Sequence, residues 1–280
     1  MAKQSDDLLP RGSLELRRFD DHEWEFAYPR LTSVAYNRLD EAIDRMHSGR
    51  VEPAERIYLD LVQHHPEFLD ARHHLAILLD GTGRTQEAFE LWRLSVSIGM
   101  TAFPLGFEWA QDILPWECLD NRPFLRAYHG LGLAFLKRRN IDGAAESFQN
   151  LLKLNPSDNQ GARALLIHCH FRKGRPEDVL AVCKRYPFDG MEQVLYGRVL
   201  ALLQLDRPDE ARAALQKAME FVPLVAEELA KKRHLRPKGM RPGYVTYGGA
   251  DQAYCYWSEE GRFWRKTEGA IDFVRRAVLV

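Results

Sequence analysis

Seven polar side chains of this 280-residue chain have the types and spacing to bind a ligand. Arginine holds a carboxylate with two parallel hydrogen bonds, while histidine, glutamine and tyrosine supply further donors and acceptors. The seven are His73, Arg126, His129, Gln160, Arg163, His170 and Tyr196. Their chemistry predicts a surface for an extended peptide or partner segment, in particular an anionic or carboxylate-bearing one.

The same residues have two other interpretations. Polar helix faces commonly meet only water, so the set is also what a solvated face would show. Alternatively, another segment of the chain covers the surface as an intramolecular partner. The sequence leaves all three interpretations open.

A repeat of 34 residues places these side chains on a common stripe. One period separates Ala42 from Ala76, Gly49 from Gly83, Ala54 from Ala88 and Tyr58 from Trp92. Small residues let two helices approach closely where they cross, and glycine provides a turn at a helix end. A fixed period of this length predicts stacked helical hairpins. Positions 2, 5, 9 and 12 of each repeat then share one side of the first helix, and the seven residues occupy positions 2, 5 or 12.

These positions resemble the tetratricopeptide repeat, with its small, large and proline positions. Five units begin at Ala35, Leu69, Leu125, Asn159 and Glu192. The fourth unit is degenerate, since Gly174 falls one place late in it. The resemblance implies an all-α, right-handed superhelical solenoid of helical hairpins with capping segments, whose concave face binds peptides or partner helices.

Two interruptions of the period predict the domain organisation. An aromatic insertion with Trp109 and Trp116 is expected to pack against the array, because burying its rings is favourable. The ends of such an array need caps. The predicted segments are 1–34 as an N-terminal cap, 35–102 as repeats one and two, 103–124 as the insertion, 125–225 as repeats three to five, and 226–280 as a C-terminal capping hairpin. Within the last, we expect an amphipathic helix around residues 250–257 and a short helix capped by Thr267.

The second half carries further resemblances. The strings NRPFLR at 121–126, HGLGL at 129–133 and LNPSDNQG at 154–161 resemble a group of bacterial tetratricopeptide-repeat proteins. The strings GADQAY at 249–254 and WRKTEGA at 264–270 are similar to the C-terminal region of the suppressor of tumorigenicity 7 family. Together they span about residues 110–280. They imply a helical-repeat fold without a defined chemistry. The membrane association of that family's eukaryotic members is not expected here, because no segment is apolar enough to span a bilayer.

The composition favours a cytoplasmic protein with a protein partner. A net charge of −1 gives no overall attraction to nucleic acid or to a lipid surface, and we expect neither as a partner. Asp6 and Asp7 stand where a signal peptide would carry basic residues. The four cysteines form no C-x-x-C pair and are expected to be reduced and partly buried.

The sequence gives little support to catalysis. No phosphate loop, dinucleotide fingerprint or nucleophile elbow is present. The pairs His64-His65 and His73-His74 point adjacent rings about 100° apart on a helix, which does not converge on a metal ion. We therefore predict a non-enzymatic scaffold or adaptor without a cofactor or metal. A catalytic or small-molecule-sensing function in the C-terminal region, and a self-association module, remain the alternatives.

Overall fold

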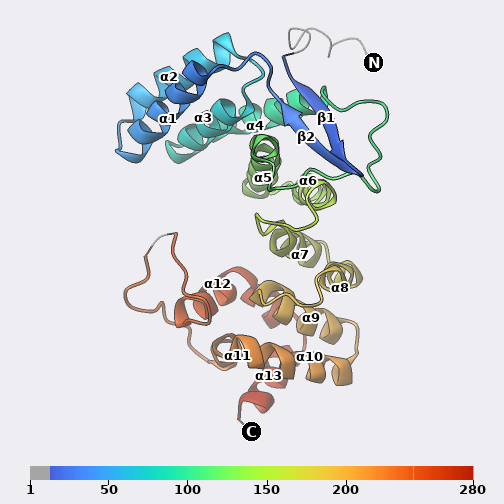
Figure 1. Cartoon of the computed structure of the whole chain (residues 1–280). Helices are drawn as coiled ribbons and strands as arrows, with labels where there is room; N and C mark the ends of the chain where they lie inside the picture. The colour runs from blue at the N-terminus through green and yellow to red at the C-terminus, as the bar shows by residue number, and fades with distance from the viewer. Residues whose placement is uncertain (1–12, 242, 280) are drawn as a thin grey trace. The chain divides into compact units, whose positions relative to one another are not determined.

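The computed structural model describes residues 13–241 and 243–279, and the chain divides into two compact units, unit 1 (Met1–Ala162) and unit 2 (Arg163–Val280) (Figure 1). In chain order the helices of the described residues are α1 (Ser33–His47), α2 (Val51–His64), α3 (Leu69–Gly81), α4 (Thr85–Met100), the 3₁₀ helix η1 (Leu119–Asn121), α5 (Arg122–Lys137), α6 (Ile141–Leu154), α7 (Ala162–Arg172), α8 (Pro176–Arg185), α9 (Glu192–Gln204), α10 (Pro208–Phe221), α11 (Pro223–Ala230), α12 (Ala250–Lys266) and α13 (Ala270–Val278). The predicted all-α class is confirmed. Asp6 and Asp7 lie outside the described residues.

The turns within the hairpins share one backbone conformation. Gly49 and Gly83, at position 15 of their repeats, have φ of 76° and 87°. Arg139 and Asp206 occupy the same position in repeats three and five, with φ of 59° and 55°. The fourth hairpin turns at Gly174, with φ of 64°. The connection requires a left-handed residue, and the chain adopts it even where a side chain makes it costly.

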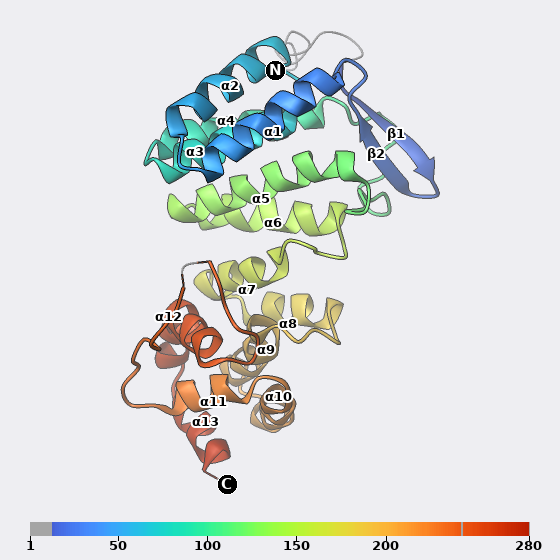
Figure 2. The ribbon, with the colours of Figure 1, turned by 60° about the vertical axis from the view of Figure 1, so that its left-hand side comes forward.

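The small and large positions of the repeat meet in the core of unit 1, whose hairpins α1–α2, α3–α4 and α5–α6 are visible in Figure 2. Ala42, Ala54 and Tyr58 of the first hairpin are fully buried. In the third, a Cβ built on Gly132 would lie only 2.5 Å from the Phe148 ring. Glycine is needed there because α5 and α6 approach closely at this crossing.

A β-hairpin precedes the first helix, and the repeat pattern does not predict it. Strands β1 (Glu15–Asp20) and β2 (Glu23–Ala27) are antiparallel, with Leu16 opposite Phe26. The Asn121 side chain accepts a hydrogen bond from the Phe26 amide and donates one to the Trp24 carbonyl, each at 2.9 Å. The Phe26 ring packs on Phe124 at a centroid distance of 5.0 Å. These contacts tie the strands to the aromatic insertion and α5, whereas we expected residues 1–34 to cap the N-terminal end of the array.

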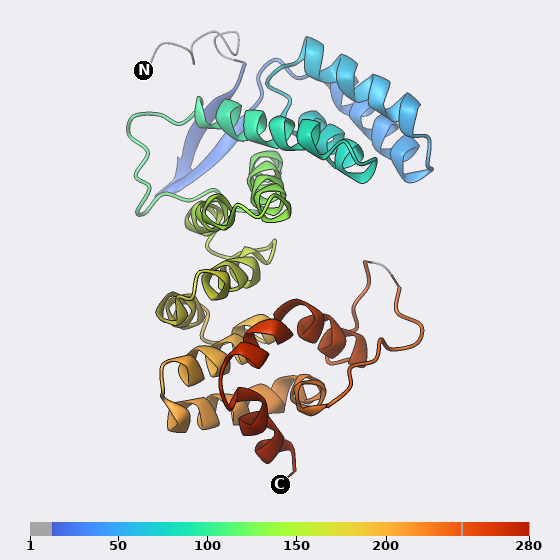
Figure 3. The same ribbon diagram turned by 180° about the vertical axis from the view of Figure 1, so that it is seen from behind.

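The C-terminal helices of unit 2 pack on one another and on α9. Helix α12 contacts α9 and α11, and α13 contacts α11 and α12 (Figure 3). The two predicted C-terminal helices are thus confirmed, but the expected N-cap is wrong. Thr267 follows α12, where its hydroxyl donates to the Phe263 carbonyl, and Gly269 precedes α13.

Across the described part of the chain, no helix combines the length and apolarity needed to cross a lipid bilayer.

Candidate functional site

The first helices of the hairpins in unit 1 form a common surface. Helix α3 lies between α1 and α5 and contacts both. We call this surface the first-helix face and define it by Tyr36, Asp70, His74, Arg126 and His129. The Tyr36 side chain is exposed, and the other four residues are half-buried.

Asp70 stands at the centre of the first-helix face. Its Oδ1 lies 3.4 Å from Nη1 of Arg126 and 3.8 Å from Nε2 of His74. The Arg126 guanidinium also lies 5.7 Å from the Trp116 ring, so the aromatic insertion supplies one side of this surface. Sequence reasoning did not select Asp70 or Trp116 as site residues. Asp70 could have been found, because it and Arg126 occupy position 2 of consecutive repeats.

His73 is buried and does not present donors to the surface. Its Nδ1 accepts a hydrogen bond from the Trp92 indole at 3.2 Å. Burial and the neighbouring groups of His74 and Arg126 lower the pKa of His73 to about 3. The imidazole is therefore neutral near pH 7 and serves as a structural acceptor in the second hairpin.

His129 and Gln160 have polar atoms that lack an intramolecular partner. His129 Nε2 and Gln160 Oε1 are both buried without a hydrogen bond. Burial lowers the pKa of His129, against the opposing effect of Asp158. The ring is thus neutral near pH 7 and able to donate from one nitrogen and accept at the other.

The other three predicted residues belong to unit 2, and two of them, Arg163 and Tyr196, are occupied by local contacts. Arg163 donates from Nε to Asp189, and its guanidinium lies 5.3 Å from the Tyr186 ring. Tyr196 is fully buried and donates to the Val222 carbonyl at 2.8 Å. A ligand at the surface of unit 2 does not reach the Tyr196 hydroxyl.

His170, on α7, is half-buried. Its Nδ1 is 3.8 Å from Asp178 and makes no hydrogen bond. Burial lowers the pKa of His170, against the opposing effect of Asp178.

Helix α12 covers the first helices of unit 2. Gln252 donates to Glu192 on α9 at 2.6 Å, and Tyr256 packs on Tyr196 at a centroid distance of 5.8 Å. His168 on α7 lies 2.6 Å from the Glu260 carboxylate. In unit 2 the tail of the same chain therefore covers the part of the predicted surface around Tyr196. The sequence identified α12 as amphipathic but carried no information about where its apolar side would pack.

The predicted residues carry less net positive charge in the structure than their types suggest. Each arginine of the predicted set has a carboxylate partner, Asp70 for Arg126 and Asp189 for Arg163. The histidines of the set have lowered pKa values, chiefly through burial. What is left on the first-helix face is a polar surface, near neutrality, with unsatisfied hydrogen-bonding atoms.

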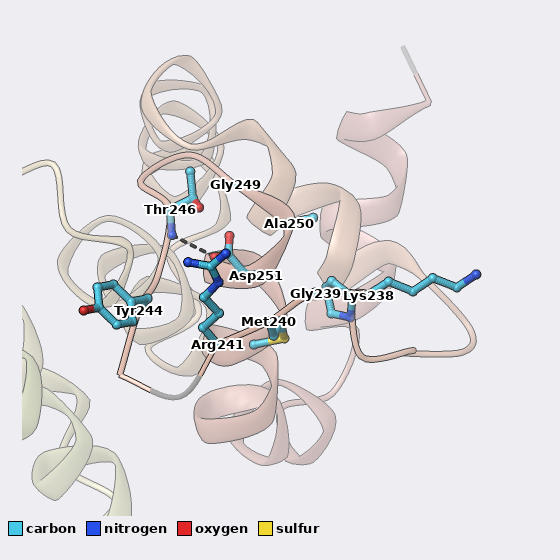
Figure 4. Close-up of a pocket in the computed structure, with 10 residues that line it drawn as sticks. Lys238, Gly239, Met240, Arg241, Tyr244, Thr246, Gly249, Ala250 and Asp251 are labelled. Carbon is cyan, nitrogen blue, oxygen red and sulfur yellow. Dashed lines mark hydrogen bonds between the residues drawn. The ribbon is translucent and has the colours of Figure 1, made fainter.

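Three features of the described residues bear on the catalytic alternative. No group of three or more His, Cys, Asp or Glu among them is arranged to hold a metal ion. Cys169 and Cys183 are buried, and burial raises the pKa of each thiol to about 12. A hollow of about 510 Å³ lies at the start of α12, in the region where the catalytic alternative was expected (Figure 4). Its carboxylate, Asp251, accepts hydrogen bonds from the amides of Thr246 and Gln252 and is committed to the helix start.

Comparison with known proteins gives one family and several solved folds. A model of the family described as transcriptional repressor TCF25 matches residues 56–250. The crystal structure of MamA protein aligns at a TM-score of 0.50 and 17% identity, over 72% of this chain and 98% of that chain. YrrB, described as a TPR protein with an unusual peptide-binding site, aligns at a TM-score of 0.49 and 16% identity, over 68% of this chain and 87% of that one. No curated protein sequence matches.

The alignment with MamA protein confirms the tetratricopeptide-type fold that the repeat predicts, and at this identity it shows the fold alone. The family whose model matches differs from the suppressor of tumorigenicity 7 family, so the resemblance of the tail to that family stays a prediction.

Proposed function

The chain belongs to the Tcf25 family, and from this membership and the hairpin fold we propose that the protein is a non-enzymatic scaffold that binds a peptide segment of a partner protein on its first-helix face. The description of the family as a transcriptional repressor extends the proposal. The partner is a protein of the transcription machinery, and repression acts by holding it. This role differs from the cytoplasmic adaptor that the composition favoured.

Unsatisfied polar atoms carry the proposal. On the first-helix face, His74 Nδ1 and His129 Nε2 are buried and have no hydrogen-bond partner within the protein. Buried polar groups are nearly always hydrogen-bonded, because an unpaired one costs about 1–3 kcal/mol. An extended peptide offers alternating backbone donors and acceptors, and we propose that the His74 and His129 rings turn outward to meet them, since these atoms are covered in the unbound chain. In unit 2, His170 Nδ1 and Gln193 Oε1 also lack a hydrogen bond, but α12 already packs on α9 there.

The charges of the first-helix face define what the peptide carries. Asp70 lies between Arg126 and His74, and it neutralises most of the local positive charge. A ligand carboxylate therefore gains only by displacing Asp70 from Arg126. We propose backbone recognition as the main contribution, with an acidic side chain of the ligand adding affinity at Arg126 when it makes that exchange.

Selection of peptides tests the proposal. A random 12-residue peptide library displayed on phage is selected on the full chain, and a recovered peptide is measured by fluorescence anisotropy. His129→Ala is expected to weaken binding about tenfold, the effect of losing one good hydrogen bond. Arg126→Gln is expected to have an effect of similar size for a peptide that carries an acidic residue. Replacing acidic residues of the peptide by their amides isolates the contribution of the carboxylate.

A charge-matched control separates the face from general electrostatics. Arg93 lies on the solvent-facing side of α4, where it pairs with Glu90 at 2.8 Å. Arg93→Gln removes one positive charge there and is expected to leave peptide binding unchanged. Circular dichroism confirms that each variant is folded. If no peptide is recovered, or if folded Arg126 and His129 variants bind as tightly as the unaltered chain, the first-helix face is not the binding surface.

A further inference from the structure

Residues 231–241 concentrate positive charge in a chain that is otherwise balanced. This stretch, KKRHLRPKGMR, contains six of the chain's 39 lysines and arginines. Between Glu228 and Asp251 there is no acidic residue. We call residues 231–241 the basic segment. The net charge of −1 is a sum over the whole chain and does not show this local excess of positive charge. On the basis of that sum, we expected no nucleic-acid partner.

The start of the basic segment is fixed to the helices of unit 2. Glu228 on α11 accepts from Lys231 Nζ at 2.5 Å and lies 2.9 Å from Nδ1 of His234. The His234 ring stacks on Trp257 of α12, with centroids 3.6 Å apart and planes 18° apart. The segment is therefore held at a defined place on unit 2.

The remaining charges of the basic segment are exposed and unpaired. The five are Lys232, Arg233, Arg236, Lys238 and Arg241, and none has a salt-bridge partner among the described residues. On the helices the situation differs, since Arg93 and Arg207 each pair with a glutamate three residues away. An unpaired run of this kind attracts a polyanion and releases its counterions.

Two exposed aromatic rings lie in the loop that follows, and the hydroxyl of one, Tyr247, donates to the Gly190 carbonyl at 3.4 Å. Tyr244 and Tyr247 have 75% and 63% of their surface exposed. Lys238, Arg241 and Tyr244 line the hollow of about 510 Å³ at the start of α12 (Figure 4). Flat exposed rings beside cations are the features on which unpaired bases stack while their phosphates are neutralised.

We propose that the basic segment, with Tyr244 and Tyr247, binds single-stranded nucleic acid. The five unpaired cations hold successive phosphates, and the tyrosine rings stack on bases. Unpaired bases are required, since those of a duplex are stacked on one another and offer no free face. Pro237, and Gly239 with φ of 80°, keep the segment irregular, so it has no amphipathic helix of the kind that inserts into a lipid surface.

Binding of a fluorescein-labelled 15-nucleotide oligouridylate to the full chain, followed by anisotropy in 50–300 mM salt, tests the proposal. If all five cations contact phosphates, the logarithm of the association constant falls with the logarithm of salt at a slope of about −3.5. Changing Lys232, Arg236 and Lys238 together to glutamine is expected to bring the slope to about −1.4 and to weaken binding more than tenfold at low salt. Tyr244→Ala is expected to weaken binding about tenfold with an unchanged slope.

A matched variant excludes the effect of net charge. Arg93, Arg207 and Arg212 are changed together to glutamine, which removes the same three charges from helix surfaces where each is paired with a carboxylate. This variant is expected to bind the oligonucleotide like the unaltered chain. Equal weakening in both triple variants, or no binding at 50 mM salt, overturns the proposal. So does tighter binding to phosphatidylserine vesicles than to the oligonucleotide, which would identify a membrane surface as the partner.

Discussion

At the scale of single residues, burial decides which candidate side chains carry charge. His73 and Tyr196 occupy the same repeat position as His129, yet the first two are buried and hydrogen-bonded inside their own units. The helical period places all three on one stripe, but it does not say how deeply each neighbouring hairpin covers that stripe. The charge of Arg126 is offset by the carboxylate of Asp70, which lies 56 residues away in the chain and which the period does not identify as its partner.

The buried imidazole of His73 makes stability depend on pH. Its pKa is lowered to about 3 in the folded protein, while an unfolded chain has a value near 6.5. Between these values the unfolded state binds the extra proton. The contribution of the neutral His73 ring to the free energy of unfolding is therefore complete above about pH 6.5. It is lost as the pH falls toward 3, by up to about 1.4 kcal/mol per pH unit.

We expect His73→Gln to be less stable than the parent chain at pH 7 but to lose less stability on acidification. Urea unfolding of both proteins at pH 7.0 and pH 5.5 measures the difference. If both proteins lose the same unfolding free energy between pH 7.0 and pH 5.5, then His73 is protonated as easily in the folded chain as in the unfolded one, and its pKa is not lowered by burial.

At the scale of elements, close approach of helices is set by glycine. A Cβ at Gly132 would meet the fully buried Phe148 ring at 2.5 Å. At Gly81, near the end of α3, a Cβ would meet no atom within 4 Å. The two sites therefore separate packing from backbone effects for the same substitution.

Gly132→Ala is expected to destabilise the protein by about 1–3 kcal/mol, because Phe148 has nowhere to move. Gly81→Ala is expected to range from no change to a stabilisation of about 1 kcal/mol, since alanine restricts the unfolded chain. Thermal or urea unfolding of the two variants provides the comparison. A Gly132→Ala protein as stable as Gly81→Ala would show that α5 and α6 can separate at little cost.

The sequence predicts the repeated elements far better than the irregular ones. Ala42, Ala54 and Tyr58 revealed the hairpins because helix crossings require small and large residues at fixed intervals. The β-hairpin was missed because its two short strands depend on Asn121, a residue 95 positions from Phe26. Long-range pairings of this type leave no periodic pattern. The unsatisfied atoms of His129 and Gln160 were equally invisible, since they depend on what the neighbours fail to supply.

At the scale of the whole molecule, the cores of the two units are formed by different kinds of element. Unit 1 combines three helical hairpins with the aromatic insertion, where Phe26 packs on Phe103 and Phe124. In unit 2 the C-terminal helices complete the core, with Trp264 fully buried and donating to the Tyr256 hydroxyl at 3.0 Å. Repeat proteins derive their stability from neighbouring contacts, so local damage need not spread through the chain.

Each core is expected to unfold by itself. Phe26→Ala and Trp264→Ala both remove a large buried ring, at a cost of about 3–5 kcal/mol within the affected unit. Hydrogen exchange measured by mass spectrometry on the full chain is expected to accelerate in unit 1 for the first variant and in unit 2 for the second. Acceleration throughout the chain in both variants would show that a single cooperative transition joins the two cores. Local acceleration would place the first-helix face and the basic segment on independently stable supports, so that either binding activity can be removed while the other is retained.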